Sequence, residues 1–90
     1  MSTVRNDSED LRLFAGQFSR FQEELYQNTL SMKGNFNRLG DTWQDEQYVR
    51  FGEKIDDFAK RVAGFLQRTE NVPDGLNRLA DLSEDHDRIK

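Results

Sequence analysis

The residue types best suited to bind a metal or to transfer a proton lie near the end of the chain, where His86 stands between Asp85 and Asp87. Adjacent side chains diverge, whereas a stable metal site needs spaced ligands that converge on a rigid frame. The stretch is therefore interpreted as solvated, and no metal, cofactor or catalytic residue is expected. The chain has no cysteine, and its six glycines are too scattered for a phosphate-binding loop or a nucleophile elbow. An enzyme acting on a small-molecule substrate is the least expected class.

Composition and charge indicate one small domain with a thin core. The 90 residues are 34% hydrophobic and 33% charged, and a chain this short buries only about 60 to 65% of its unfolded surface. The net charge of -4 comes from interspersed acidic and basic residues. A nucleic-acid surface or an anionic bilayer would attract a one-sided basic cluster instead. Neither nucleic acid nor membrane is therefore expected as a partner.

The location of the protein is expected to be cytoplasmic, with export as an open alternative. The longest apolar stretches are two or three residues, far below the length of a membrane-spanning helix. The N-terminus does not resemble a signal peptide, which has a basic segment followed by an apolar run. Any export is therefore expected to proceed without a cleaved signal peptide.

The spacing of apolar residues predicts two long amphipathic helices. From Leu11 onward, apolar side chains recur every three or four positions, which predicts a first helix over about 8–39. The same spacing predicts a second helix over about 46–82, after a turn at 40–45, within a single domain 1–90. Pro73 interrupts the second pattern and leaves two interpretations open: a kinked continuous helix, or a loop and a short last helix. The charged tail 84–90 is expected to fray.

A joint this short forces the two helices to run antiparallel, so the predicted fold is an all-α helical hairpin. A single hairpin would leave much of its aromatic stripe in water, more than monomers normally tolerate. Pairing of two hairpins into a four-helix bundle would cover the stripe. The expected dimer interface comprises Leu11, Phe14, Phe18, Phe21, Leu25, Met32, Ile55, Phe58, Val62 and Phe65. The sequence leaves open whether the partner is a second copy or a related small helical protein.

Small and polar residues interrupt both stripes. Gly52 and Gly64 fit either the close approach of a neighbouring helix or a tolerated flaw on an exposed face. Asn28, Asn35 and Thr69 fit either a buried seam that fixes register or a hydrated edge of the stripe.

The joint between the helices, "LGDTWQDEQYVRF", holds the only tryptophan of the chain. Leucine stands four residues before Trp43, and phenylalanine eight residues after it. This spacing resembles the WXG-motif (ESAT-like) family, the small helical hairpins of type VII secretion systems. Trp43 is interpreted as a hydrophobic plug at the end of the hairpin, a role compatible with docking to the secretion partner that the resemblance implies. The predicted turn motif comprises Leu39, Gly40, Thr42, Trp43, Asp45 and Phe51.

Two features depart from the family pattern. Asp45 stands where the family has glycine, and its carboxylate is expected to cap the second helix while Gly40 supplies a permissive backbone. The tail lacks the tyrosine followed four residues later by an acid that exported members or their partners often carry, since the only tyrosines are Tyr26 and Tyr48. The sequence therefore does not decide whether the protein is itself exported.

The resemblance implies a noncatalytic protein that dimerises through its helices and acts as substrate, co-substrate or targeting chaperone of a type VII-like secretion system. The implied partners are itself or a related small helical protein and, beyond these, a larger secreted effector and the secretion ATPase. The alternative is a cytoplasmic helical adaptor or structural coiled-coil subunit unrelated to secretion. Membrane lysis is disfavoured, because the apolar faces are needed for the core and the polar faces are not basic.

Overall fold

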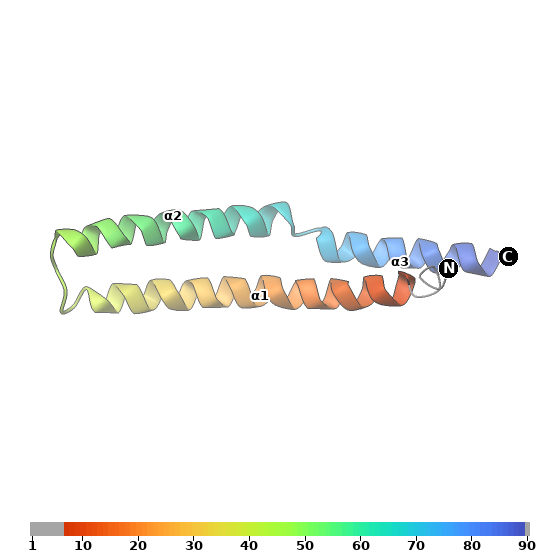
Figure 1. The fold of residues 1–90 in the computed structure, drawn as a ribbon, viewed down its shortest axis with the longest axis horizontal. Coiled ribbons are helices and arrows are strands. Elements are labelled where there is room, and N and C mark those ends of the chain that lie inside the picture. Colours follow the sequence, from red (N-terminus) through yellow and green to blue (C-terminus); the bar gives the residue numbers. More distant parts are fainter. Residues whose placement is uncertain (1–6, 90) are drawn as a thin grey trace. The chain divides into compact units, whose positions relative to one another are not determined.

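The fold is all-α. A computed structural model describes residues 7–89, with the side chains of residues 8–85, and shows the helices α1 (Asp7–Leu39), α2 (Glu46–Arg68) and α3 (Val72–Ile89) (Figure 1). No strand occurs among these residues, and no helix in this range is both long and apolar enough to cross a membrane. The predicted helical hairpin is confirmed, whereas the association of two hairpins into a four-helix bundle stays a prediction.

The first helix ends at Leu39 because the chain satisfies its last carbonyl groups locally. The Gly40 amide donates to the carbonyl oxygen of Asn37 at 3.1 Å, and the Trp43 amide donates to that of Leu39 at 3.0 Å. Such short-range bonds replace the helical partners that the last turn of any α-helix lacks. The turn of residues 40–45 follows directly.

The interruption in the second half of the chain separates two helices. α2 ends at Arg68, and α3 begins at Val72, so Pro73 lies in the first turn of α3. Proline is tolerated there because the amide that it lacks would have no helical acceptor. The amide of Val72 donates to the carbonyl oxygen of Thr69 at 3.0 Å across the turn. Of the two interpretations of Pro73, the short last helix is the one found, with the break before the proline.

The chain divides into two compact units, each built from antiparallel helical segments. One unit pairs the described residues up to Gln22 with those from Thr69 onward, and the other comprises Glu23–Arg68. In the first unit, the side-chain amide of Gln22 donates to the carbonyl oxygen of Thr69 at 2.8 Å and to its hydroxyl oxygen at 3.0 Å. In the second unit, α1 and α2 run side by side from the turn (Figure 1).

The core within each unit is thin. Ala15 and Ala80 are buried in the first unit, and Val62, with 7% of its surface exposed, and Thr29 are buried in the second. None of the described large side chains is fully buried. Many large apolar side chains are instead about half exposed, namely Leu13, Phe14, Phe21, Tyr26, Leu30, Leu39, Val49, Phe51, Phe58, Leu79 and Leu82. The helices therefore retain apolar surface that the chain itself does not cover.

The small and polar interruptions of the stripes have different explanations. A Cβ atom on Gly52 would lie 3.2 Å from the ring of Phe36, so this glycine permits close packing of α2 on α1. A Cβ atom on Gly64 would meet only the guanidinium of Arg68 on the same helix, at 3.1 Å, which fits a tolerated flaw. Asn28 is exposed, as expected for a residue at the edge of the stripe.

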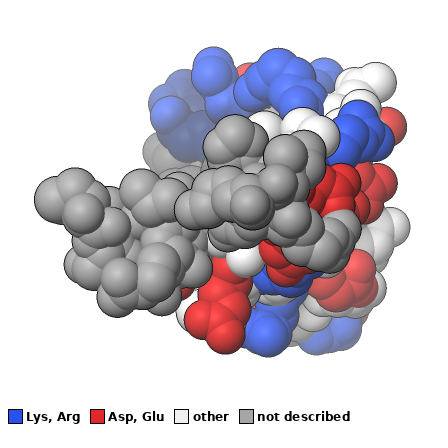
Figure 2. Space-filling model, turned by 90° about the vertical axis from the view of Figure 1, so that its right-hand side faces the viewer, with Lys and Arg blue, Asp and Glu red and all other residues white. Residues whose placement is uncertain are grey.

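Charged side chains of both signs share the molecular surface. Figure 2 shows Lys and Arg beside Asp and Glu on the end of the molecule that it views, so neither sign alone covers that face. Along α2, Arg50 pairs with Glu46 at 3.6 Å and Arg61 with Asp57 at 2.9 Å, one turn apart. These are the acid-first pairs of a solvated helix face.

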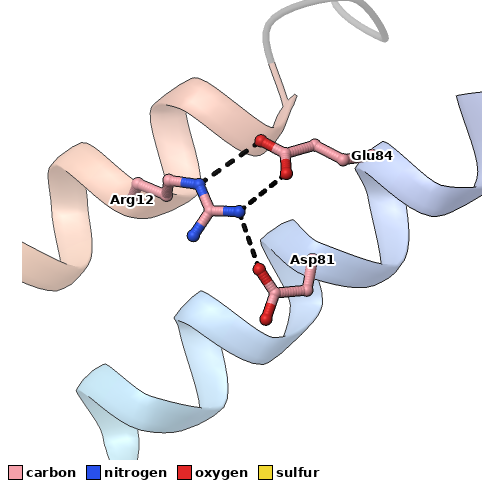
Figure 3. Close-up of polar contacts among 3 residues, drawn as sticks. All are labelled: Arg12, Asp81 and Glu84. Atoms are coloured by element: carbon pink, nitrogen blue, oxygen red, sulfur yellow. Dashed lines mark hydrogen bonds and ion pairs between the residues drawn. The ribbon is translucent and has the colours of Figure 1, made fainter.

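The last helix continues to Ile89, beyond Glu84, where the charge content predicted fraying. Arg12 of α1 explains the order, because its Nη2 donates to Glu84 Oε1 at 2.8 Å and to Asp81 Oδ1 at 2.7 Å (Figure 3). The hydrogen bonds that the guanidinium donates to Glu84 and then to Asp81 raise its pKa further above the ordinary value. Exposed ion pairs contribute little individually, but this cluster ties α3 to α1 in the first unit.

Candidate functional site

The turn is closed by a cluster of four aromatic rings. Tyr48 stacks on Phe36 with ring centroids 4.5 Å apart, and Trp43 lies edge-on to Tyr48 at 5.6 Å. Trp43 also contacts Phe51, with centroids 5.9 Å apart. The indole remains partly exposed. Trp43 thus fills the end of the hairpin and still presents part of its ring at the surface.

Gly40 is required by the packing of Tyr48. The Tyr48 hydroxyl donates to the carbonyl oxygen of Phe36 at 3.1 Å, which fixes the ring over the end of α1. A Cβ atom on Gly40 would lie 2.5 Å from the Tyr48 Oη atom. No described glycine has a positive φ angle, so the expected reason for Gly40, an unusual backbone conformation, is wrong. The close approach of the tyrosine is the physical reason.

Asp45 lies at the N-terminus of α2 and accepts hydrogen bonds from its free amides. The Gln47 and Tyr48 amides donate to Asp45 Oδ1 at 2.9 and 3.2 Å, the contacts that define an N-cap. The pKa of the Asp45 carboxyl lies below its ordinary value, first because the Trp43 side chain donates to it and then because of the Tyr48 and Gln47 amides. Thr42 does not share this role, since its hydroxyl donates to the carbonyl oxygen of Leu39, at 3.4 Å.

Replacing Asp45 is expected to separate capping from backbone flexibility. Asp45→Ala removes the acceptor and should lower the melting temperature by roughly 4 °C. Asp45→Gly should lower it by a smaller amount, because glycine is itself a fair N-cap residue. Thermal unfolding followed by circular dichroism checks both variants. Equal losses for the two variants would show that the cap does not stabilise the turn.

The contribution of the Asp45 cap is expected to disappear in acid. Because the folded protein holds the pKa of Asp45 below its unfolded value, the carboxylate stabilises the fold above the unfolded pKa of about 4 and loses this effect as the pH falls through the folded pKa. The difference in melting temperature between the wild type and Asp45→Ala should therefore be constant near neutral pH and shrink in acid. A difference that persists unchanged at about pH 2 would contradict this assignment.

One face of the second unit carries a row of phenylalanines along α2. Phe51 and Phe58 are 48% and 45% exposed, and Phe65 follows after the same interval of seven residues, about two helical turns. The buried Val62 marks the side of α2 that packs on α1. The phenylalanine row lies next to that side, on the adjoining face of the helix. On α1, Met32 and Leu39 lie to the same rotational side of the buried Thr29. In two antiparallel helices, a rotation in the same sense about each chain direction turns from the contact line toward the same outer face. Met32, Leu39 and the phenylalanine row therefore form one surface.

The first unit repeats this arrangement with α1 and α3. Phe14, Phe18 and Phe21 contact one another in sequence, with centroids 5.9 and 6.0 Å apart. Phe14 and Leu79 line a groove of about 460 Å³ together with Asp10, Leu11 and Ser83. The cluster of Arg12 with its carboxylates lies on the other side of the buried Ala15 and Ala80 line. The phenylalanines of this unit therefore lie on one face, whereas the exposed Leu13 and Leu82 lie on the outer sides of α1 and α3.

The expected interface residues differ in their exposure within the single chain. Phe14, Phe21 and Phe58 are exposed, whereas Val62 is buried. Val62 packs inside the hairpin because it lies on the line of α2 that faces α1, so its side chain is not presented to a partner. The remaining expected residues are partly buried, namely Leu11, Phe18, Leu25, Met32, Ile55 and Phe65.

Two polar contacts that hold the helices together carry no signal in the sequence. Arg12 is 69 residues from Asp81, and Gln22 is 47 residues from Thr69. Neither pair follows a helical spacing, because Arg12 reaches from α1 to α3 and Gln22 reaches from α1 to the turn before α3. Only the antiparallel register, once known, places them opposite each other.

Groups of side chains suited to metal binding are absent from the part of the chain that the structure describes. The expectation that His86 is solvated concerns a side chain outside the described residues. The described residues have the geometry of a binding surface: an aromatic turn, a capped helix and an uncovered row of phenylalanines.

Comparison with known proteins agrees with this geometry. The family model described as "Proteins of 100 residues with WXG" matches residues 3–88. The chain is also similar to the type VII secretion system extracellular protein A of Staphylococcus aureus strains USA300 and Newman, in each case 19% identical over 88 residues, which cover 98% of this chain and 91% of the relative. No solved structure matches the chain significantly.

Proposed function

Because the chain belongs to the family of proteins of 100 residues with WXG, we propose that it serves a type VII-like secretion system as a noncatalytic substrate, co-substrate or targeting chaperone. The resemblance indicated by the spacing around Trp43 is confirmed by the family match, despite Asp45 in the place of the usual glycine. The similarity to extracellular proteins of the type VII system supports a role in export.

The observation that carries the proposal is the uncovered phenylalanine face. Phe14 and Phe21 are 50% and 48% exposed in the first unit, and Phe51 and Phe58 are 48% and 45% exposed in the second. Exposed apolar patches of this kind mark surfaces that associate with another protein. A second helical hairpin, packed on the phenylalanines of each unit, would cover this apolar surface and complete a four-helix bundle.

The aromatic turn supports a second contact in the proposed role. Trp43 is held by Tyr48 and Phe51 and remains partly exposed, as do the anchoring aromatics of many protein interfaces. The helices would bind the paired hairpin, and the turn would remain available to a larger effector or to the secretion ATPase.

An export assay in the source organism tests the proposal. Culture medium and cells are compared between the wild type, a strain that lacks this protein and a strain that lacks the membrane ATPase of the system. We expect the protein, or an effector that depends on it, to leave the cell only when both components are present. A protein that stays in the cytoplasm, and whose loss changes the export of no other protein, would instead be the helical adaptor of the alternative hypothesis.

A further inference from the structure

The polar side chains of the turn are bound within the turn itself. The side-chain amide of Gln44 donates to the carbonyl oxygen of Gly40 at 3.1 Å. The Trp43 side chain, whose indole nitrogen is its only polar atom, donates to the Asp45 carboxylate. The turn therefore holds its own side chains in place before a partner arrives.

The Asp45 carboxylate is a fixed anchor for the indole. Its Oδ1 atom accepts the amides of Gln47 and Tyr48 at 2.9 and 3.2 Å, so the backbone of α2 sets the position of the group. A carboxylate has two oxygens with about four acceptor sites, and the two amides leave room for the indole N–H group. A charged acceptor also makes a stronger hydrogen bond than a neutral one.

The rest of the Trp43 ring is held by aromatic side chains. Its centroid lies 5.6 Å from that of Tyr48 and 5.9 Å from that of Phe51, and the residue remains partly exposed. Because the nitrogen is bound to Asp45, the part of the indole that a partner can contact consists of ring carbon atoms. The glycine that is usual in place of Asp45 has no side-chain oxygen and would leave the N–H group free.

We propose, on the basis of the docking role proposed above for the turn, that Asp45 is a positioning residue for Trp43. Its carboxylate holds the indole in one orientation and occupies its N–H group. The partner that recognises the turn then contacts the ring carbon atoms through an apolar pocket, which needs no acceptor for the indole. A side chain that is already ordered loses less conformational freedom on binding, which strengthens the contact.

The single tryptophan makes the hydrogen bond directly observable, because the chain gives one indole N–H resonance in a proton–nitrogen NMR spectrum. Asp45→Ser is the test variant, since serine caps a helix about as well as aspartate but has one oxygen, which the amides use. The indole proton of this variant should exchange with water about two- to tenfold faster than that of the wild type. An unchanged indole resonance and exchange rate would overturn the inference.

A matched control separates the hydrogen bond from the charge of the turn. Asp41→Ser removes an exposed carboxylate of the same turn, but not the one that the indole binds. It should keep the wild-type indole resonance and exchange rate. Equal changes in Asp41→Ser and Asp45→Ser would show that the indole responds to the charge of the turn and not to a bond with Asp45.

Export of the protein, or of an effector that depends on it, measures what the orientation contributes. We expect Asp45→Ser to lower export by about two- to tenfold at equal cellular abundance, because the ring must then be ordered on docking. Asp41→Ser should leave export unchanged. Trp43→Phe keeps an apolar ring without an N–H group and should retain part of the export. In that background Asp45→Ser should have no further effect, because the carboxylate has nothing left to hold.

The outcomes separate the positioning role from the docking role. Wild-type export of Asp45→Ser, or an equal loss in the Trp43→Phe background, would overturn the inference, because the carboxylate would not act through the indole. Export abolished as completely by Trp43→Phe as by Trp43→Ala would overturn it too, since the partner would then read the N–H group. Full export of Trp43→Ala would refute the docking role of the turn, and the inference with it, whatever the indole resonance shows.

Discussion

Replacing Phe58 by glutamate is expected to weaken association of the chain by roughly 100-fold or more, with its helices intact. The ring is half exposed, so the hairpin does not depend on it for its own core. In a pair of identical hairpins the substitution places two carboxylates in the covered face, and each central aromatic residue of an interface contributes about 2 kcal/mol or more. Sedimentation velocity measures the change in the dissociation constant.

The matched control for this prediction is Val49→Glu on the same helix. Val49 is 58% exposed but precedes Phe51 by two residues, which places it about 200° around the helix axis and away from the phenylalanine face. It should leave the dissociation constant nearly unchanged. Equal weakening by Val49→Glu and Phe58→Glu would show that the phenylalanine row is not the covered surface.

Gly40→Ala is expected to destabilise the fold by about 1 to 3 kcal/mol, as overpacking of a filled site generally does. The new Cβ atom would lie 2.5 Å from the Tyr48 Oη atom and 2.8 Å from its Cζ atom. The ring has no free direction in which to yield, because it is stacked on Phe36 and hydrogen-bonded to the Phe36 carbonyl oxygen. Urea unfolding of the two proteins measures the loss.

Two further variants make this prediction specific to the turn. Gly16→Ala lies in α1 with no other atom within 4 Å of the added Cβ, so it should stabilise the helix by about 0.5 to 1 kcal/mol. In a Tyr48→Ala background the penalty of Gly40→Ala should nearly vanish, because the clashing ring is gone. A penalty that persists without the ring would place the strain in the backbone instead.

The helices were predictable because their physical cause is local. Apolar residues from Leu11 to Leu39 repeat every three or four positions, and α1 occupies this range. Pro73 was harder, because proline both disrupts a helix interior and fits a first turn. The choice depends on whether the preceding residues can close a turn, as Thr69 does by accepting the Val72 amide.

The side chains that contact each other across the hairpin were less predictable. Phe58 and Val62 belong to one apolar stripe in the sequence, yet the first is half exposed and the second buried. Helical periodicity gives the width of the stripe, whereas the line of contact with α1 decides which side of it faces inward. Gly40 shows the same limit, since its reason is the Tyr48 ring eight residues later.

The mass of the wild-type protein in solution tests the central claim, that the phenylalanine face is covered by another molecule, most directly. Light scattering at increasing protein concentration measures this mass. As the concentration rises, the account predicts a helical protein whose mass approaches twice 10.6 kDa. A stably folded helical protein that remains at 10.6 kDa at every concentration would contradict it.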